Sequence, residues 1–493
     1  MTRVLVVGGG ISGLAAAWHL ADTLKAAVTL VEAAGRLGGK IATEPFAGID
    51  LDTGPDAFLA RVPAAADLAR EAGLADDLVA PGTGQAWLWT RGRLRRLPSG
   101  LVLGVPGDIA ALARSRLLPP PAAARAALDL VLPGRPVGPE EDVAVGRLVS
   151  RRMGRAVQMG LVDPLLGGIN AGHTDQLSAA VAAPQLLAAA RRDRSLVRGL
   201  RASVPAAAGA PTGGGPGETG AGAPVFLTVR GGLSRLVDAL ASGIAAAPGG
   251  EIVSDDGVAA LVPDGPRWSA RLHSGRVITA DAVIVACPAP AAATLVGAVS
   301  PTAAATLRSI GTASVALALL AYPSAALPEP LDGSGFLVPR PEGRLITAAS
   351  WVGSKWPHLA TPGLVLVRAS AGRVDDHRAM ELDDEELIAA AHAELTSAMG
   401  LRAAPIEARV HRWPDAFPQY EVDHLDRMAS VERQLATDAP GVVLAGAALR
   451  GVGIATCIAG ARVAAGRAAE LAAVLSGQPA LERSSSCPRS TLS

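Results

Sequence analysis

The sequence contains little cysteine and no excess charge of either sign. Its three cysteines, Cys287, Cys457 and Cys487, show no CxxC or zinc-finger spacing, so we expect neither a disulfide framework nor a structural zinc site. Reduced thiols of this kind are typical of a cytoplasmic protein. The 45 basic and 45 acidic residues give a formal net charge of zero. A broad basic face is therefore not expected, and no nucleic-acid partner is predicted.

Long uninterrupted hydrophobic runs are also absent. The uncharged stretch at residues 282–307 is long enough to span a bilayer, but Pro288, Pro290 and Pro301 interrupt it. The first residues run directly into a strand pattern, which predicts no signal peptide. These absences favour a cytoplasmic location, while peripheral contact with a membrane through one face stays open.

Signatures of hydrolytic and metal-dependent catalysis are missing as well. The chain has no HExxH motif, no cysteine–histidine cluster and no nucleophile elbow with an ordered serine, histidine and aspartate. We therefore expect no metal site, and we assign no catalytic side chain.

A strand–turn–helix–strand pattern opens the chain. Residues 3–7 predict a buried strand, residues 14–24 an alanine-rich helix and residues 28–32 a second strand. This beginning predicts a parallel, doubly wound sheet, that is, a Rossmann-like α/β domain. Since 49% of the 493 residues are apolar, the chain has enough material for a sizeable core, and its length suggests two to four domains.

The turn in this pattern has the spacing of a dinucleotide-binding fingerprint. Gly8 permits the tight turn, Gly10 lets the backbone approach a pyrophosphate, and Gly13 lets the helix pack closely on the strand. The helix N-terminus then offers unpaired N–H groups and a favourable dipole to phosphates. Glu32 closes the second strand 19 residues after Gly13, where a carboxylate would bind ribose hydroxyls.

A second match to the same glycine spacing serves as a warning. Gly215, Gly217 and Gly220 follow no predicted strand and lie in a tract rich in proline, glycine and alanine. We interpret this match as chance, because the fingerprint has meaning only between a strand and a helix.

The residues after Glu32 favour FAD over NAD. Arg36-Leu37-Gly38-Gly39-Lys40 resembles the flavoprotein pattern E-x-x-x-R-x-G-G, which continues the dinucleotide site. No second credible fingerprint for a nicotinamide cofactor is present. This favours electron transfer from FAD directly to oxygen or another small acceptor.

Six later segments carry a further pattern in a fixed order. They are residues 51–59 (LDTGPDAFL), 83–86 with 97–100, 163–172 (DPLLGGINAG), 229–233 (VRGGL), 413–420 (WPDAFPQY) and 445–454 (AGAALRGVGI). Together they resemble the bacterial oxygen-dependent porphyrinogen oxidases, above all the Gram-positive and actinobacterial type. The resemblance implies an amine-oxidase-like and protoporphyrinogen-oxidase-like flavoprotein architecture. In that architecture a Rossmann-like FAD-binding domain is joined to an α+β substrate domain and a helical subdomain.

The resemblance also implies FAD contacts at matching positions. These are Gly8, Gly9, Gly10, Ile11, Ser12, Gly13, Val31, Glu32, Lys40, Gly54, Pro55, Asp56, Ala57, Val258, Trp413, Ala447, Val452, Gly453 and Ile454. For Val258 and Trp413 a plain core role stays an alternative. Arg61, which follows the 51–59 segment, is our candidate for binding a substrate carboxylate.

The expected domains are discontinuous along the chain. We expect an FAD-binding domain from residues 1–80, 225–300 and 410–475, a substrate-binding domain from 81–100 and 301–409, a helical subdomain at 101–202, a flexible insertion at 203–224 and a disordered tail at 484–493.

The resemblance implies a reaction as well. Coproporphyrinogen III would be oxidised to coproporphyrin III in heme biosynthesis, with oxygen as acceptor, over three two-electron cycles. The chain would thus be an oxidase acting on CH–CH groups, with flavin N5 as the hydride acceptor, so the cofactor performs the chemistry. Downstream heme-pathway enzymes are candidate partners.

Three alternatives stay open. One is protoporphyrinogen IX as the substrate, and another is an amine oxidase or desaturase on the same scaffold. The aromatic content of 3% disfavours an amine oxidase, because such enzymes usually need an aromatic cage. The third is a flavin-binding protein without turnover.

Overall fold

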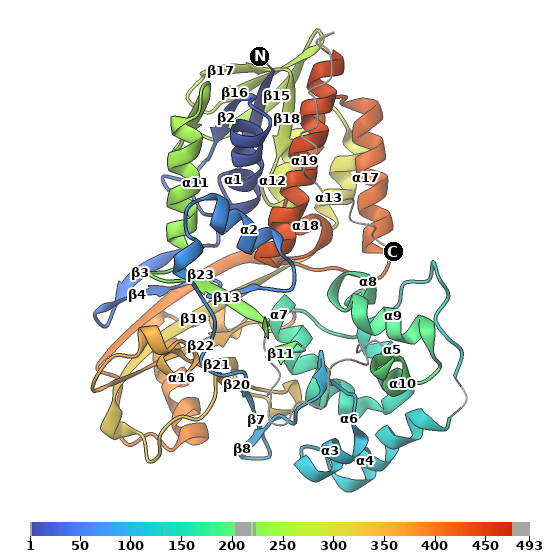
Figure 1. Cartoon of the computed structure of the whole chain (residues 1–493), viewed down its shortest axis with the longest axis vertical. Helices are drawn as coiled ribbons and strands as arrows, with labels where there is room; N and C mark the ends of the chain where they lie inside the picture. The colour runs from blue at the N-terminus through green and yellow to red at the C-terminus, as the bar shows by residue number, and fades with distance from the viewer. Residues whose placement is uncertain (1, 133, 203–217, 220–222, 476–493) are drawn as a thin grey trace.

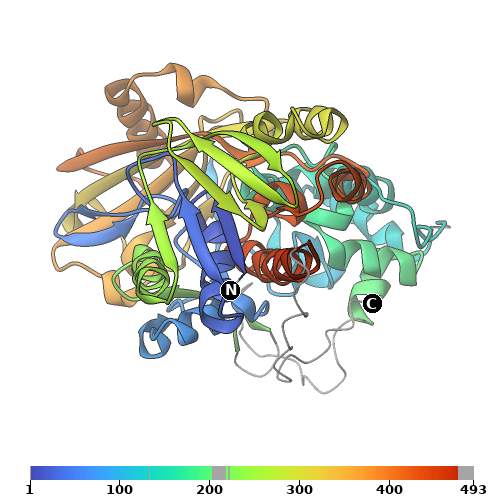
Figure 2. The same cartoon turned by 90° about the horizontal axis from the view of Figure 1, so that it is seen from above.

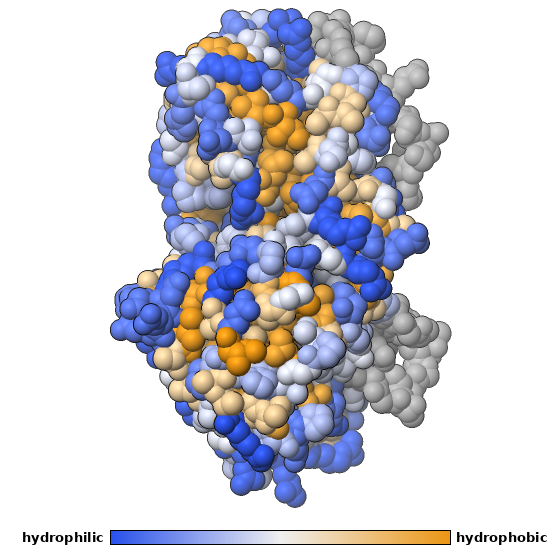
Figure 3. Space-filling model, turned by 90° about the vertical axis from the view of Figure 1, so that its left-hand side faces the viewer, coloured by the Kyte–Doolittle hydropathy of each residue, from blue (hydrophilic) through white to orange (hydrophobic). Residues whose placement is uncertain are grey.

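The computed structural model describes residues 2–132, 134–202, 218–219 and 223–475. Most of the expected insertion at 203–224, the expected tail at 484–493 and the second glycine motif lie outside the described residues. The described chain forms an upper and a lower half (Figure 1). From the side, the surface narrows between the halves, and hydrophobic side chains gather above and below this constriction (Figure 3).

A five-stranded parallel sheet forms the centre of the upper half (Figure 1). Its strands, in spatial order, are β14 (Gly250–Val253), β2 (Ala27–Val31), β1 (Arg3–Val7), β18 (Ala282–Val285) and β24 (Val442–Leu444). The central strands β1 and β18 are aliphatic and almost wholly buried, as expected for parallel strands covered on both faces. The predicted Rossmann-like α/β fold is confirmed.

Different layers cover the two faces of this sheet (Figure 2). Helices α1 (Ile11–Trp18), α11 (Ser234–Ala246) and α19 (Ile454–Leu475) pack on one face. The other face carries an antiparallel sheet and three helices: β15 (Val258–Asp264), β16 (Arg267–Leu272), β17 (Val277–Ala280), α12 (Ala289–Val296), α13 (Pro301–Arg308) and α17 (His424–Asp438).

A seven-stranded sheet forms one part of the lower half. Its strands, in spatial order, are β23 (Glu407–Pro418), β19 (Thr312–Pro323), β22 (Leu364–Ala371), β21 (Ile346–Trp351), β20 (Gly335–Leu337), β7 (Trp87–Thr90) and β8 (Arg93–Arg96). Neighbouring strands are antiparallel except for β20 and β7. Helix α16 (Asp384–Met399) begins with a capping box of Asp383 and Glu386 and buries Ala391 and Leu395 against the sheet.

Short helices with their own apolar core form the rest of the lower half. They are α3 (Ile109–Ser115), α4 (Pro120–Ala127), α5 (Val145–Met153), α6 (Arg155–Val157), α7 (Gly168–Asn170), α8 (Ala179–Ala182), α9 (Pro184–Arg192) and α10 (Leu196–Arg201). A π-helical segment, Gln158–Gly167, joins α6 to α7. Within the described ranges, no helix has both the length and the apolarity needed to cross a bilayer.

Candidate functional site

The carboxyl ends of β1 and β2 meet the start of α1 at the glycine turn (residues 8–13). Gly8 has a φ of 108°, which favours glycine, and its N–H donates to the Val31 carbonyl at 2.8 Å. A Cβ on Gly13 would lie 1.8 Å from the Gly8 carbonyl oxygen. Glycine is therefore required for the helix to pack this closely on the strand.

Two further glycine segments continue the close packing that begins at the glycine turn. Gly10 forms a parallel bridge with Gly38, and a Cβ on Gly39 would lie 3.1 Å from the Gly10 Cα. The next residue, Lys40, brings its carbonyl oxygen to 2.0 Å from where a Cβ on Gly54 would be. The backbone therefore packs closely from the glycine turn to Gly54, and side chains at Gly39 and Gly54 would not fit.

Glu32 lies at the end of β2, beside the glycine turn. Its two carboxylate oxygens accept hydrogen bonds from the N–H groups of Gly9 at 2.6 Å and Ala34 at 2.9 Å. The carboxylate is therefore held where the dinucleotide fingerprint requires it.

Two helices, α1 and α19, begin at this edge of the sheet. Neither α1, which starts at Ile11, nor α19, which starts at Ile454 after Val452 and Gly453, has an acidic residue in its first turn. No side chain caps α1. First-turn N–H groups of this kind bind phosphates, so these residues fit the pyrophosphate of a dinucleotide.

Lys40 lies near both helix starts. The Ser12 hydroxyl and the Lys40 ammonium both act on the Cys457 thiol, whose pKa is raised by burial and lowered by these two neighbours. Burial also lowers the pKa of Lys40. Residues from α1, α19 and the segment after Glu32 therefore meet at one place.

The 53–57 segment, which contains Gly54, Pro55, Asp56 and Ala57, is held by the lower half. The Asp56 carboxylate binds Lys355 Nζ and Arg368 Nη1, each at 2.8 Å, and accepts a hydrogen bond from Trp356 Nε1 at 3.1 Å. Sequence reasoning missed Lys355 and Arg368. The one available signal was that the chain has only three lysines, Lys25, Lys40 and Lys355.

Trp413 and Val258, both expected near FAD, differ in their surroundings. Trp413, on β23, donates from Nε1 to the Thr53 carbonyl at 2.8 Å, which brings it to the 53–57 segment. Val258 opens β15, and its side chain is buried in the same core cluster as Val31. A core role therefore describes the Val258 side chain, while its contact with FAD stays a prediction.

Ala447 opens the short helix α18 (Ala447–Arg450), which two buried side chains hold in place. Tyr420 Oη donates to the Ala447 carbonyl at 2.7 Å, and His424 Nε2 donates to the Ala448 carbonyl at 2.8 Å. Burial lowers the pKa of His424, so its ring is neutral near pH 7. Its role is to hold the backbone before Val452.

Arg61, the candidate for binding a substrate carboxylate, contacts a short helix of the lower half. Its guanidinium lies against the side-chain amide of Gln185 on α9, and burial lowers its pKa. Arg61 therefore lies between the 51–59 segment and the short helices.

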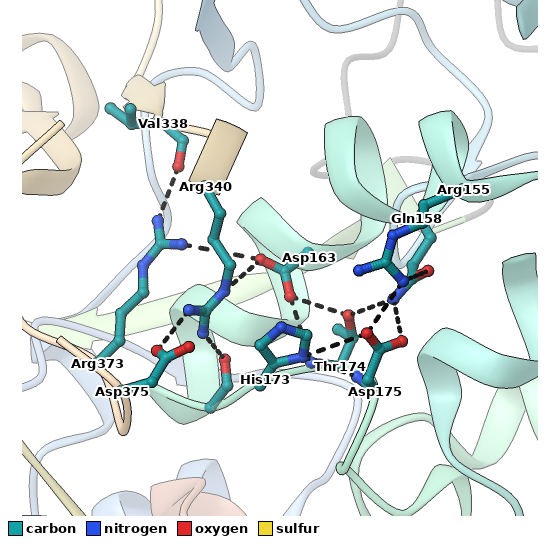
Figure 4. A network of polar contacts seen from close by, with 11 residues as sticks. Arg155, Gln158, Asp163, His173, Thr174, Asp175, Val338, Arg340, Arg373 and Asp375 are labelled. Atoms are coloured by element: carbon teal, nitrogen blue, oxygen red, sulfur yellow. Dashed lines mark hydrogen bonds and ion pairs between the residues drawn. The ribbon is translucent and has the colours of Figure 1, made fainter. Parts of the chain in front are cut away.

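A buried polar network ties the 163–172 segment to the lower sheet (Figure 4). Asp163, which is fully buried, accepts from Arg340 Nε and Thr174 Oγ1, both at 2.9 Å, and lies 3.8 Å from Arg373 Nη1. Arg340 also binds Asp375 at 2.5 Å. The network joins two parts of the lower half, and no residue of the dinucleotide fingerprint takes part in it. Among the described residues, no group of histidine, cysteine and acidic side chains is placed to hold a metal.

Known proteins resemble this chain over most of its length. The family model described as flavin containing amine oxidoreductase matches residues 11–473. The coproporphyrinogen III oxidase of Bacillus subtilis (strain 168) is 34% identical over 461 residues, covering 92% of this chain and 95% of that protein. The coproporphyrinogen III oxidase of Propionibacterium freudenreichii is 35% identical over 483 residues, covering 93% and 89%.

Solved structures extend the likeness to the whole fold. A crystal structure from Exiguobacterium sp. 255-15, described as a candidate protoporphyrinogen oxidase, has a TM-score of 0.82 and 31% identity, covering 97% of this chain and 99% of that chain. Cyclohexylamine oxidase from Brevibacterium oxydans shares the fold with a TM-score of 0.65 at 19% identity, covering 96% and 99%. The chain therefore belongs to the flavin-containing amine oxidoreductase family, and its cofactor is FAD.

Proposed function

We propose that this protein oxidises coproporphyrinogen III to coproporphyrin III in heme biosynthesis, with FAD as cofactor and oxygen as acceptor. The observation that carries this proposal is the likeness, over more than nine-tenths of the chain, to two coproporphyrinogen III oxidases. Protoporphyrinogen IX is the second candidate substrate, because the protoporphyrinogen oxidase of Bos taurus is also 30% identical over 495 residues.

The residues around the glycine turn would bind the dinucleotide part of FAD. The first-turn N–H groups of α1 and α19 would bind the pyrophosphate, and Glu32 would bind the ribose, since its carboxylate lies beside the turn. Val31 and the Val258 backbone would lie toward the adenine.

The 53–57 segment and its neighbours would surround the flavin ring. Trp413, Lys40 and the backbone at Ala447 and Val452 would complete this end of the site. The hydrogen bonds of Trp413 to Thr53 and of Tyr420 to Ala447 support this, together with the electrostatic interaction between Lys40 and Cys457. When bound, FAD supplies the capacity to accept two electrons, in the form of a hydride, from a reduced carbon skeleton. The protein orients the substrate and excludes water, and Arg61 would bind one propionate.

The same likeness supports the division into domains and the setting of the protein. We propose that residues 1–80, 225–300 and 410–475 form the FAD-binding domain and that 81–100 with 301–409 form the substrate-binding domain, with 101–202 as a helical subdomain. A cytoplasmic location is part of the proposal. Contacts with a membrane surface and with downstream heme-pathway enzymes are secondary proposals, which vesicle sedimentation and pull-down with those enzymes would test.

A direct assay tests the proposed substrate. Purified FAD-loaded protein in air should convert coproporphyrinogen III to fluorescent coproporphyrin III, with hydrogen peroxide formed, faster than it converts protoporphyrinogen IX. Amines and phytoene should give no turnover. A faster rate with protoporphyrinogen IX would make that compound, in place of coproporphyrinogen III, the proposed substrate. Turnover of an amine alone would overturn the proposal.

A further inference from the structure

Asp56, Lys355 and Arg368 form a partly buried charge cluster between the two halves. Their side chains are only 20%, 18% and 8% exposed. Solvent and salt therefore screen their charges much less than those of surface pairs. Burial alone would raise the pKa of Asp56, but the charges of Lys355 and then Arg368 hold that pKa below its usual range. The carboxylate is thus ionised near neutral pH.

The cluster also fixes the backbone of the 53–57 segment. Arg368 uses its second terminal nitrogen to donate to the Gly54 carbonyl, while Trp413 holds the Thr53 carbonyl. On its other side, Gly54 lies against the Lys40 carbonyl, where no side chain would fit. The segment is therefore clamped between the upper half and side chains from the lower sheet.

Two cations face one carboxylate in this cluster. Within the described part of the chain, Asp56 is the one acidic group at ion-pair distance from Lys355 or Arg368. Asp52 directly precedes the segment. Burial raises its pKa to about 6, although hydrogen bonds from Thr43 and Leu233, and then the charge of Arg368, oppose this rise. The single carboxylate of Asp56 therefore cannot neutralise the charges of both Lys355 and Arg368. Each single substitution in the cluster changes the local charge by one unit in a known direction.

We propose that this cluster positions the 53–57 segment beside the flavin of FAD and sets the reduction potential of the flavin, with Lys355 raising that potential and Asp56 lowering it. The inference rests on the proposed FAD site. A nearby cation favours the reduced flavin, which carries the additional electrons, and a nearby carboxylate opposes it. Arg368 is the positioning residue, because it binds both Asp56 and the Gly54 backbone.

The test measures the midpoint potential of purified FAD-loaded protein by equilibration with a redox dye, without any porphyrinogen. In Lys355→Met the ratio of reduced to oxidised flavin at a fixed potential should fall by about threefold or more, which is about 14 mV for a two-electron couple. In Asp56→Asn the ratio should rise by a similar factor. The double variant should have a midpoint potential close to that of the unmodified protein.

Matched variants separate charge from general damage. Lys25→Met removes a lysine that is 72% exposed and pairs with Asp22, so it should leave the potential unchanged. Lys355→Arg keeps the charge and should stay near the unmodified value. If Asp56→Asn fails to fold, the contrast between Lys355→Met and Lys355→Arg still decides the matter.

Two outcomes contradict the inference. One is a shift in Lys355→Met no larger than that in Lys25→Met, and the other is a shift of the same sign in Lys355→Met and Asp56→Asn. These potentials are independent of porphyrinogen turnover. Opposite shifts in a protein that does not oxidise porphyrinogens would overturn the proposed function alone, whereas turnover with unshifted potentials would overturn this inference alone.

Discussion

The glycine turn at residues 8–13 and the 53–57 segment lie on either side of Lys40, but different interactions hold them. The glycine turn is fixed by the backbone of its own strand–helix unit, as the hydrogen bond from Gly8 to Val31 shows. The 53–57 segment is fixed by Lys355 and Arg368, which stand 299 and 314 residues away from their partners Asp56 and Gly54. One side of the site thus forms locally, and the other forms only when the two halves have packed together.

The largest expected effect comes from filling the glycine turn. In Gly13→Ala the new Cβ would lie 1.8 Å from a backbone oxygen that cannot move without displacing β1. We expect loss of bound FAD and a fall in the free energy of unfolding of about 4 kcal/mol. FAD absorbance after gel filtration and urea unfolding measure these effects.

Gly460→Ala is the matched control for this substitution. Gly460 lies inside α19, and nothing lies within 4 Å of a Cβ added there. Alanine should stabilise the helix by up to about 1 kcal/mol and leave the FAD content unchanged. Equal FAD loss in both variants would show that the glycine turn has no special role.

The next effect should come from removing the clamp on the 53–57 segment. Arg368→Met leaves Asp56 with Lys355 alone and the Gly54 carbonyl without its guanidinium donor. We expect a loss of about 3 kcal/mol in the free energy of unfolding, as for other broken buried ion pairs. FAD should still bind through its dinucleotide part, with altered flavin absorbance. Full loss of FAD would show that the glycine turn cannot hold FAD when the 53–57 segment is released, which would contradict the comparison.

This contrast explains which features could be predicted from the sequence. The glycine turn, Glu32 and the parallel sheet follow from patterns within some thirty residues, where spacing alone fixes the geometry. The partners of Asp56 have no such spacing, because β22 and the short helix α14 (Val352–Lys355) reach it only through the tertiary fold. The same holds for Asp163, which lies in a recognised segment but binds Arg340, 177 residues away. The pattern predicts a helix at residues 14–24. The structure has an α-helix at Ile11–Trp18 that ends in a π-helical turn at His19–Thr23, and neither the earlier start nor the π-helical turn left a signal in the pattern.

A smaller effect is expected at Glu32. Glu32→Ala removes the carboxylate that is held by Gly9 and Ala34, and with it the proposed ribose contact. We expect FAD to bind about tenfold more weakly, which corresponds to about 1.4 kcal/mol. Glu32→Gln, which keeps an acceptor, should bind FAD with intermediate affinity. Titration of the apoprotein with FAD gives both values, and unchanged affinity in Glu32→Ala would exclude the ribose role.

The smallest expected effect is on the pH dependence of the free energy of unfolding, and it comes from Asp52, which precedes the 53–57 segment. Burial raises the pKa of Asp52 from 3.8 to about 6. The folded protein therefore binds more protons than the unfolded chain between these values, and the stability associated with Asp52 is lost as pH rises through 6. Asp52→Asn keeps the oxygen that accepts from Thr43 and Leu233. It should raise the free energy of unfolding at pH 7 by about 1 kcal/mol and flatten its pH dependence between pH 4 and 7. Urea unfolding across this range measures the difference, and an unchanged pH profile would contradict the assignment.

The central claim is that the FAD of this protein accepts electrons from a porphyrinogen. It is tested most directly by mixing the yellow protein with coproporphyrinogen III in the absence of oxygen and following flavin absorbance. The account predicts rapid bleaching, return of the yellow colour when air is admitted, and no bleaching with amines or phytoene. Flavin that stays oxidised with both coproporphyrinogen III and protoporphyrinogen IX would contradict it.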